Sequence, residues 1–388
     1  MKEGYKKTEL GLIPSEWRIN NLNKIVDICY GKSQKEVEES DGKYKILGTG
    51  GVIGYASNFL WDKPSVLIGR KGTIDKPQYI EEPFWTVDTL FYTKIKETNL
   101  AKWLFYYLNN IDLKKYNEAT GVPSLSVGNL NLIKIITPPL KEQQKIAEIL
   151  SSVDTQIDDT DKLIEKTKEL KKGLMQRFLT KGIGHTEFKI TEVGEIPVEW
   201  EVRCIGEISD LINGRAFKPS DWKKEGIPII RIQNLNGTDE YNYYEGEVED
   251  RYFIRKGQLL FSWSGSRGTS FGPHIWHGID GVLNQHIFKV NIKEDIPIDI
   301  NFIYYNLKGV TEKIEQEAHG SAGLVHITKG NLEKVKLSIP MLEEQIRIGN
   351  ILSSVDTQIE EYENKKSKLE ELKKGLMQQL LTGKIRVV

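Results

Sequence analysis

The feature that most constrains the fold of this 388-residue chain is an internal duplication of its sequence. Three segments return along the chain. TELGLIPSEWRI (Thr8 to Ile19) returns as TEVGEIPVEWEV (Thr191 to Val202) with seven of twelve residues identical, while ILSSVDTQI (Ile149 to Ile157) and ELKKGLMQ (Glu169 to Gln176) return unchanged, beginning at Ile351 and Glu371. A period of roughly 200 residues is far longer than the ~20–50 residues of a solenoid repeat. The sequence therefore predicts a duplicated pair of domains.

The distance between the copies grows along the chain. It is 183 residues at the first match, 196 at a weaker match between Lys71–Thr73 (KGT) and Arg267–Thr269 (RGT), and 202 at the last two. This growth predicts insertions of 13 and then 6 residues in the second copy. Because the copies agree best in the C-terminal segment of each copy, which is predicted to be helical, and diverge in the globular part, we expect one scaffold that performs the same task on two different targets.

Each copy ends in a predicted long helix. The first is expected from Leu140 to about Lys181, after Pro138 and Pro139 and before Gly182; the second follows Pro340 and stops at Gly383. At ~1.5 Å per residue each would be ~60 Å long. Apolar residues recur at heptad spacing and predict a seam, which Thr160, Thr167 and Lys171 interrupt. The seam residues are Leu150, Val153, Ile157, Ile164 and Leu174 in the first helix and Leu352, Val355, Ile359, Leu369 and Leu376 in the second. We expect the two helices to form an antiparallel coiled coil with a pseudo-two-fold axis.

The rest of the chain has short β-branched and aromatic runs broken by Gly and Pro, which favours a mixed α+β fold. Short helices are expected at Ala101–Asn109 and near Asn301–Leu307. The predicted organisation has four segments: a first recognition domain (1–139), a first helix (140–184), a second recognition domain (185–340) and a second helix (341–388).

Catalytic signatures are missing from the sequence. There is no Gly-x-x-x-x-Gly-Lys-Ser/Thr phosphate loop and no Gly-x-Ser-x-Gly motif, and GTGGVIG (Gly48 to Gly54) has the wrong spacing for a dinucleotide fingerprint. His274 and His277 lack a third ligand nearby, so packed or surface histidines are the favoured interpretation. Cys29 and Cys204 are too few for a disulfide framework. With no apolar run of ~18 residues and no signal sequence, we expect a cytoplasmic protein without a membrane span.

Recognition remains as the function. Basic residues on Gly/Ser loops suit contacts to phosphate, and Arg, Asn and Gln also read base edges. The alternative for any single residue is a loop that merely connects strands. The candidate DNA-binding residues are Arg70, Lys71, Thr73, Arg215, Lys218, Arg231, Gln233, Asn234, Arg267, Thr269, Asn284 and Gln285.

These motifs resemble the specificity subunit of type I restriction-modification systems. The resemblance is carried by PSLSVGNLNLIKIITPPLKEQQKIAEIL (Pro123 to Leu150), by the segments around Trp17 and Trp200, and by GIPIIRIQN (Gly226 to Asn234). The second copy departs from the first passage at His326-Ile327-Thr328 and at Pro340-Met341, but it keeps the Glu-Gln pair. The resemblance covers essentially the whole chain.

The resemblance implies two target-recognition domains that each read half of a split, asymmetric site in double-stranded DNA, with two conserved helices that set the gap between the halves. It also implies two adenine-methyltransferase subunits and, through them, restriction subunits as partners. AdoMet, ATP and Mg²⁺ would belong to those partners, and this chain would be non-catalytic with no cofactor or metal of its own. A coiled-coil scaffold whose globular ends bind only proteins is the alternative, and an unrecognised enzyme is a third.

The net charge of −1 is distributed unevenly over the four predicted segments. The four segments carry +3, +1, −5 and 0 in chain order. Because non-specific DNA binding needs a basic surface, this distribution predicts that the chain binds DNA weakly alone, and the second domain most weakly.

Overall fold

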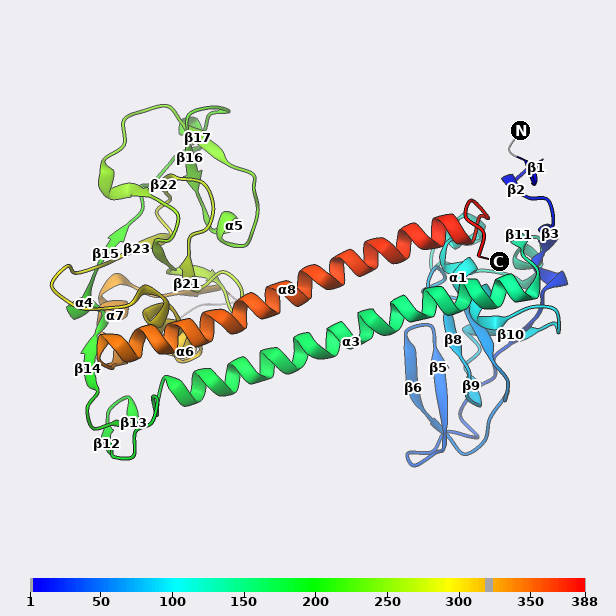
Figure 1. The fold of residues 1–388 in the computed structure, drawn as a ribbon, viewed down its shortest axis with the longest axis horizontal. Helices are drawn as coiled ribbons and strands as arrows, with labels where there is room; N and C mark the ends of the chain where they lie inside the picture. Colours follow the sequence, from blue (N-terminus) through cyan, green and yellow to red (C-terminus); the bar gives the residue numbers. More distant parts are fainter. Residues whose placement is uncertain (1–2, 318–323, 388) are drawn as a thin grey trace. The chain divides into compact units, whose positions relative to one another are not determined.

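The computed structural model describes residues 3–317 and 324–387 (Figure 1). The chain forms two compact units. The first consists of Met1–Lys162 with Glu363–Val388, and the second of Leu163–Tyr362. Each unit thus joins one globular part with one half of each long helix. The units cut across the four consecutive segments expected from the sequence, because the helices pack on each other as well as on their own globular parts.

The first unit is built on a four-stranded antiparallel sheet of order β4-β10-β7-β8, beside a three-stranded sheet of order β6-β5-β9. Two further strand pairs, β1-β2 and β11-β3, complete it. The strands are β1 Tyr5–Thr8, β2 Gly11–Pro14, β3 Arg18–Asn21, β4 Val26–Tyr30, β5 Tyr44–Gly48, β6 Gly51–Ala56, β7 Ser65–Gly69, β8 Gln78–Ile80, β9 Phe84–Thr86, β10 Leu90–Ile95 and β11 Lys134–Thr137.

Helix α1 packs on the four-stranded sheet of this unit, against β7 and β8. It spans Ala101–Asn109, as the sequence predicted, and buries Trp103, Leu104, Tyr107 and Leu108. The large side chains of Trp17 and Phe91 are buried in the same core. A short helix, α2 (Val127–Asn131), begins at Ser126, whose hydroxyl accepts from the Asn129 N–H and so caps the helix.

The second unit repeats this plan with sheets of order β15-β23-β19-β21 and β17-β16-β22-β18 and the pairs β12-β13, β14-β25 and β20-β24. Helix α6 (Ile300–Glu317) packs on β21 and is longer than the expected Asn301–Leu307. The other elements are β12 Phe188–Thr191, β13 Gly194–Pro197, β14 Glu201–Cys204, α4 Ile205–Ile208, β15 Ser209–Asn213, β16 Ile227–Ile230, α5 Ile232–Leu235, β17 Asn242–Tyr244, β18 Phe253–Ile254, β19 Leu259–Ser262, β20 Ser264–Ser266, β21 Gly272–Ile275, β22 Gly281–Leu283, β23 Ile287–Ile292, β24 Leu324–His326, α7 Lys329–Glu333 and β25 Lys336–Ile339.

The two long helices are α3 (Leu140–Phe178) and α8 (Leu342–Leu380), which Figure 1 draws in green and in orange to red. Helix α3 starts directly after Pro139, and α8 starts two residues after Pro340. Each is followed by a glycine with a positive φ, Gly182 at 63° and Gly383 at 72°, a conformation that glycine adopts without strain.

Within each unit the half-helices pack side by side. In the first unit Asp154 pairs with Lys373 at 2.6 Å and Asp161 with Lys366 at 2.7 Å, so the two half-helices run antiparallel. In the second unit Lys171 forms an ion pair with Asp356. Of the expected seam residues, six are buried (Leu150, Val153, Ile164, Leu352, Val355 and Ile359), and Ile157, Leu174, Leu369 and Leu376 are half-buried.

The threonines that interrupt the heptad pattern are also buried. Thr160 and Thr167 are 2% and 9% exposed. Each hydroxyl donates to the carbonyl four residues earlier, of Gln156 and Leu163, at 2.7 Å. The helix backbone satisfies their polar groups, so these threonines fit the seam despite their polarity.

Candidate nucleic-acid interface

Three strand ends of the first unit meet at one edge of its four-stranded sheet. β4 ends at Tyr30, β7 ends at Gly69, and β10 begins at Leu90, which is paired with Gly69. Arg70 follows directly, and its backbone N–H donates to the Thr89 carbonyl at 2.8 Å. The candidate residue Arg70 therefore sits where the sheet stops and loops begin.

The side chain of Arg70 is held at this edge by two neighbours. Its Nη1 donates to the Asp88 carbonyl at 3.1 Å, and its guanidinium lies 5.3 Å from the centre of the Tyr30 ring. Tyr30 is itself 55% exposed. The remaining N–H groups of Arg70 make no hydrogen bond within the part of the chain that the structure describes, so they are available to an incoming acceptor.

The second unit has the same arrangement of strand ends. β15 ends at Asn213, β19 ends at Ser262, and β23 begins at Ile287, which is paired with Ser262. Trp263 follows, and its backbone N–H donates to the His286 carbonyl at 3.2 Å.

The indole of Trp263 is fixed by polar and ring contacts. Its Nε1 donates to the Gln285 carbonyl and to Oδ1 of Asn213, both at 3.0 Å. The ring lies 5.2 Å from the His286 ring and 6.5 Å from the His326 ring, centre to centre.

Backbone hydrogen bonds correct the correspondence expected from the KGT and RGT matches. The backbone N–H of Arg70 donates to Thr89, the residue before β10, and that of Trp263 donates to His286, the residue before β23. The backbone carbonyl of Arg70 accepts from the Leu125 N–H at 2.9 Å, shortly before α2. In the same way, the carbonyl of Trp263 accepts from the Ile327 N–H at 3.0 Å, shortly before α7. Trp263 thus takes the place of Arg70, and Ser264 takes that of Lys71, which the RGT match had given to Arg267. Arg267 lies beyond β20 and is exposed, without an ion pair or hydrogen bond to any described residue.

One glycine in each unit is required by close backbone approach at this edge. A Cβ on Gly31 would lie 2.0 Å from the Val87 carbonyl oxygen, and a Cβ on Gly214 would lie 2.0 Å from that of Asn284. No side chain fits at such a distance. The two copies therefore share this turn. In the first unit it brings Gly31, the residue after β4, against the segment that leads into β10. In the second unit it brings Gly214, the residue after β15, against the segment that leads into β23.

Two candidate arginines of the second unit are fixed by aromatic rings. Arg215 donates from Nη2 to the Tyr244 hydroxyl at 2.8 Å and lies 4.4 Å from that ring's centre. Arg231 donates to Asn242 at 2.9 Å and lies 4.8 Å from the Trp222 ring. Both arginines are half-buried, and their guanidinium groups are held in place by these contacts.

Two asparagines among the candidates are buried. Asn234 is 6% exposed, accepts from the Arg231 N–H and donates to the carbonyls of Thr238 and Glu240. Asn284 is 8% exposed. The Asn234 amide is held by these three hydrogen bonds, and a DNA contact by Asn234 or Asn284 stays a prediction. Sequence could not distinguish them from exposed amides.

The other candidates lie on loops or at strand ends. Lys71, Lys218, Arg267 and Thr269 are exposed, whereas Thr73, Gln233 and Gln285 are half-buried. The Gln233 amide donates to the Glu240 carbonyl at 3.4 Å. A DNA contact by these residues stays a prediction.

Two histidines of the second unit have lowered pKa values. Burial lowers the pKa of His286, and the charge of His326 lowers it further; burial also lowers the pKa of His274, against a hydrogen bond to the Ser270 carbonyl that raises it. At neutral pH each ring is therefore uncharged, with one nitrogen that donates and one that accepts. His286, His326 and Trp263 are not among the candidates from the sequence, because the position of each at the end of the sheet follows from strand pairing.

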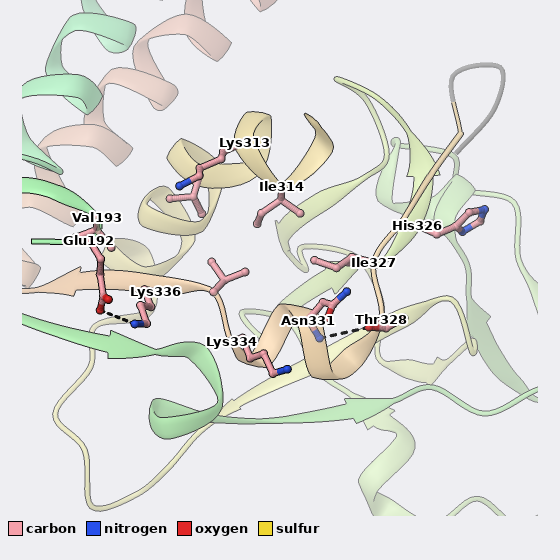
Figure 2. A pocket seen from close by; sticks show the side chains of 12 residues that line it. Glu192, Val193, Lys313, Ile314, His326, Ile327, Thr328, Asn331, Lys334 and Lys336 are labelled. Atoms are coloured by element: carbon pink, nitrogen blue, oxygen red, sulfur yellow. Dashed lines mark hydrogen bonds and ion pairs between the residues drawn. The ribbon is translucent and has the colours of Figure 1, made fainter. Parts of the chain in front are cut away.

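The second unit also has a cavity of about 860 Å³ lined by three lysines, Lys313, Lys334 and Lys336 (Figure 2). Lys336 pairs with Glu192 at 2.6 Å, as Lys134 pairs with Glu9 at 2.5 Å in the first unit. The charge of Lys336, one of the three lysines that line the cavity, is thus neutralised by Glu192. Because the first unit has the same ion pair, we assign this contact a structural role.

The Glu-Gln pair that opens each long helix has a structural role. Glu142 is 1% exposed and accepts from Trp17 Nε1 at 2.8 Å and from Arg386 Nε at 2.6 Å. Gln143 donates to the Pro138 carbonyl at 2.9 Å and accepts from the Leu100 N–H at 2.9 Å. The pair therefore fastens the helix start to its globular part.

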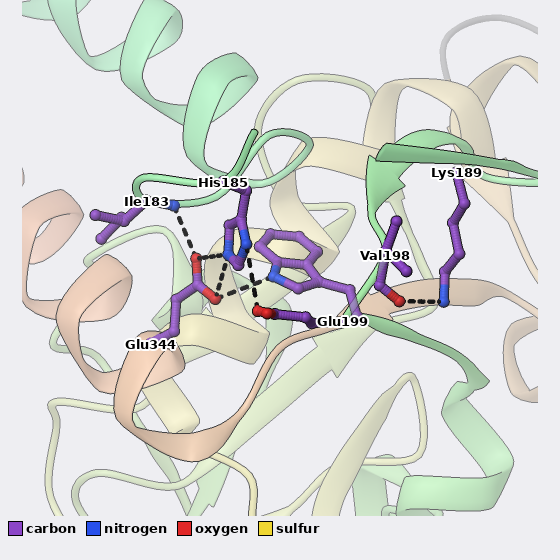
Figure 3. A network of polar contacts seen from close by, with 7 residues as sticks. Ile183, His185, Lys189, Val198, Glu199 and Glu344 are labelled. Carbon is purple, nitrogen blue, oxygen red and sulfur yellow. Dashed lines mark hydrogen bonds and ion pairs between the residues drawn. The ribbon is translucent and has the colours of Figure 1, made fainter. Parts of the chain in front are cut away.

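The second copy repeats this anchor with a histidine, His185, in the place of the arginine (Figure 3). Glu344 accepts from Trp200 Nε1 at 3.0 Å and from the Ile183 N–H at 2.8 Å, and it lies 3.0 Å from His185 Nε2. The Gln345 amide likewise bonds the Pro340 carbonyl at 2.9 Å. Arg386 and His185 thus serve the same position after α8 and after α3.

No group of three or more His, Cys, Asp or Glu side chains that could hold a metal ion occurs among residues 3–317 and 324–387. In the same part of the chain, no helix combines the length and apolarity needed to span a bilayer.

Comparison with known proteins gives consistent matches. A family model described as the type I restriction modification DNA specificity domain matches residues 14–169 and again residues 197–371. The two matches start 183 residues apart and end 202 apart, as the internal repeats do.

Two relatives come from Methanocaldococcus jannaschii. The whole chain aligns at 29% identity with 97% of the type I restriction enzyme MjaVIII specificity subunit, and at 30% identity with 97% of the putative type I restriction enzyme MjaX specificity subunit. Among solved structures, the S subunit of a type I restriction-modification system from M. genitalium matches with a TM-score of 0.65 and 16% identity, covering 94% of this chain and 96% of its own. The last likeness shows a shared fold.

Proposed function

Because the chain belongs to the family of type I restriction-modification DNA specificity proteins, we propose that it reads a split, asymmetric site in double-stranded DNA, one half with each unit. One observation carries this proposal. The two units share a strand-end edge with the same backbone hydrogen bonds but present Arg70 in one and Trp263 in the other. A shared frame with different side chains suits the recognition of two different half-sites.

In this proposal α3 and α8 form one antiparallel coiled coil, and a pseudo-two-fold axis relates the two halves of the molecule. The ion pairs Asp154–Lys373 and Lys171–Asp356 support it, since they join residues that are equivalent in the repeat. Helices of 39 residues are ~58 Å long at ~1.5 Å per residue, enough to set a distance of about one turn of DNA, ~34 Å, between half-sites.

We further propose that the chain is non-catalytic and directs two adenine-methyltransferase subunits, and through them restriction subunits, to its site. AdoMet, ATP and Mg²⁺ would be held by those partners. The segment charges support a division of labour, because a second recognition domain at −5 cannot supply much phosphate contact on its own. The free thiols Cys29 and Cys204 fit the reducing cytoplasm as the place of action.

The experiment is to co-express the chain with its cognate methyltransferase subunit in a host without other adenine methylation and to map methylated adenines genome-wide. The proposal predicts a motif of two specific halves separated by a fixed non-specific spacer. Absence of methylation, or a continuous motif, would contradict it. A scaffold that binds only proteins would give no sequence-dependent methylation.

A further inference from the structure

We propose that five equivalent positions at the end of the four-stranded sheet, where its strands stop and loops begin, determine which bases each unit recognises. This inference rests on the proposed function. We call these positions the reading cluster. Its members are Tyr30, Arg70, Asp88, Thr89 and Ser124 in the first unit, and Asn213, Trp263, Gln285, His286 and His326 in the second.

The equivalence of these positions rests on strand pairing. Tyr30 is paired with Phe91, as Asn213 is with Phe288. The Arg70 side chain donates to the carbonyl of Asp88, and the Trp263 side chain donates to that of Gln285, at 3.1 and 3.0 Å.

The other pairs follow in the same way. Thr89 and His286 accept from the backbone N–H of Arg70 and Trp263. Ser124 bridges to Lys71, and His326 is paired with Ser264, the residue after Trp263.

The frame around the reading cluster is the same in both units, whereas its side chains all differ. Gly31 and Gly214 are both glycines forced by a carbonyl 2.0 Å from the site of a Cβ, and Phe91 and Phe288 are the same residue. The five cluster positions share no residue type between the units. The shared glycines and phenylalanines are explained by the backbone that both units have in common. We therefore infer that the differing residues of the reading cluster distinguish the two DNA targets.

The chemistry of the first cluster favours a guanine edge. Arg70 brings a fixed positive charge whose guanidinium is oriented by the Asp88 carbonyl and the Tyr30 ring, leaving donors without a partner in the described residues. A guanine presents two acceptors, O6 and N7, in the major groove and is the base that arginine most often contacts with two hydrogen bonds.

The second cluster has no fixed charge. Trp263 takes the arginine's place, and His286 is held neutral by its lowered pKa. Oε1 of Gln285 and Nδ1 of His286 are enclosed without a hydrogen-bond partner among the described residues, although buried polar atoms are normally paired. A base edge at this exposed margin would supply those partners after a small turn of the side chains. We therefore expect this cluster to recognise a different base pair from the first.

The test compares methylation motifs of the chain bound to its methyltransferase subunit, for the wild type, Arg70→Ala, Arg70→Lys and Trp263→Phe. Arg70→Ala should relax one guanine position in one half of the motif, by a factor of about 5 to 150 for a lost bidentate contact, and leave the other half unchanged. Trp263→Phe should relax only the other half. Lys63→Ala is the matched control, because Lys63 is an exposed cation at the opposite end of β7, and it should leave both halves unchanged.

An unchanged motif in Arg70→Ala and Trp263→Phe would overturn the inference while the wild-type motif still supports the proposed function. If Arg70→Ala abolishes methylation, Arg70→Lys decides, because it keeps the charge but not the paired donors. A relaxed guanine position in that variant supports the inference. An unchanged motif, or a folded complex that methylates nothing, contradicts it. If the wild type itself has no split motif, the proposed function fails first.

Discussion

Asp154 on α3 forms a 2.6 Å ion pair with Lys373 on α8, a residue more than half the chain away. The same carboxylate accepts from the Tyr106 hydroxyl at 2.6 Å, which ties helix α1 of the globular part to both long helices. The second unit repeats this cluster with Tyr305, whose hydroxyl donates to Asp356 at 2.7 Å beside Lys171. Burial and the neighbouring carboxylate raise the pKa of each tyrosine well above its ordinary range.

Removal of either partner of Asp154 should destabilise the first unit. Tyr106→Phe and Lys373→Met should each lower the free energy of unfolding by about 1 kcal/mol, because a partly buried charge loses a hydrogen-bonded partner. The check is urea denaturation of both single variants and the double variant. Coupling of at least ~0.5 kcal/mol between the two is expected, since they share one carboxylate. The exposed pair Lys45–Glu82 is the control and should contribute close to nothing. Strict additivity of Tyr106→Phe and Lys373→Met would contradict the shared cluster.

The C-terminal tail should contribute strongly to the stability of the first unit. Arg386→Met leaves the buried Glu142 carboxylate without its cation and should cost about 3 kcal/mol, as broken buried ion pairs do. The measurement is the midpoint of chemical unfolding. The double variant with Glu142→Gln should recover part of the loss, because no unpaired charge then remains. A loss of unfolding free energy of less than ~0.5 kcal/mol in Arg386→Met, obtained from the midpoint and slope of the transition, would show that Trp17 alone satisfies the carboxylate.

Two glycine substitutions should have opposite effects. Gly31→Ala places a methyl group 2.0 Å from the Val87 carbonyl oxygen and should destabilise the first unit and displace the chain beside Arg70. Gly173→Ala, in the interior of α3 with open space around its Cβ, should stabilise by up to about 1 kcal/mol, because alanine is the better helix former. Thermal unfolding of both variants tests this. Equal effects of the two substitutions would contradict the close approach at Gly31.

Acid should destabilise the second unit through His274. Burial lowers the pKa of this ring in the folded chain from its ordinary value of 6.5. As the pH falls below that value, the unfolded chain takes up a proton that the folded chain resists, so stability decreases towards the lowered pKa and is unaffected above 6.5. The midpoint of urea unfolding, followed between about pH 5 and 8, should fall with acid in the wild type and less in His274→Gln. His277→Gln, at an exposed ring, is the control. An identical pH profile in the wild type and His274→Gln would contradict the assignment.

Local signals predicted much of this fold. Prolines before Leu140 and Leu342 and glycines after Phe178 and Leu380 bound the long helices, and the spacing of Trp103, Leu104, Tyr107 and Leu108 predicted α1 at its observed bounds. Features that depend on partners distant in sequence could not be predicted. The Glu-Gln pair was visible as a motif, but its role needs Trp17, which lies 125 residues away from Glu142.

The site was harder to predict than the fold for the same reason. A match of three residues suggested that Arg267 was the counterpart of Lys71, whereas strand pairing gives that place to Ser264 and puts Trp263 in the place of Arg70. Asn234 looked like a base-reading amide, but its side chain caps α5 and the turn after it. Composition cannot separate such an internal amide from an exposed one, because the difference lies in the path of the backbone.

The assignment of one half-site to each unit is tested by replacing residues 1–139 with the corresponding segment of another family member and mapping methylated adenines in the complex with the methyltransferase subunit. We expect one half of the split motif to change, while the other half and the spacer length stay as in the wild type. A complex that methylates normally but changes both halves, or neither, would contradict the assignment of one half-site to each unit.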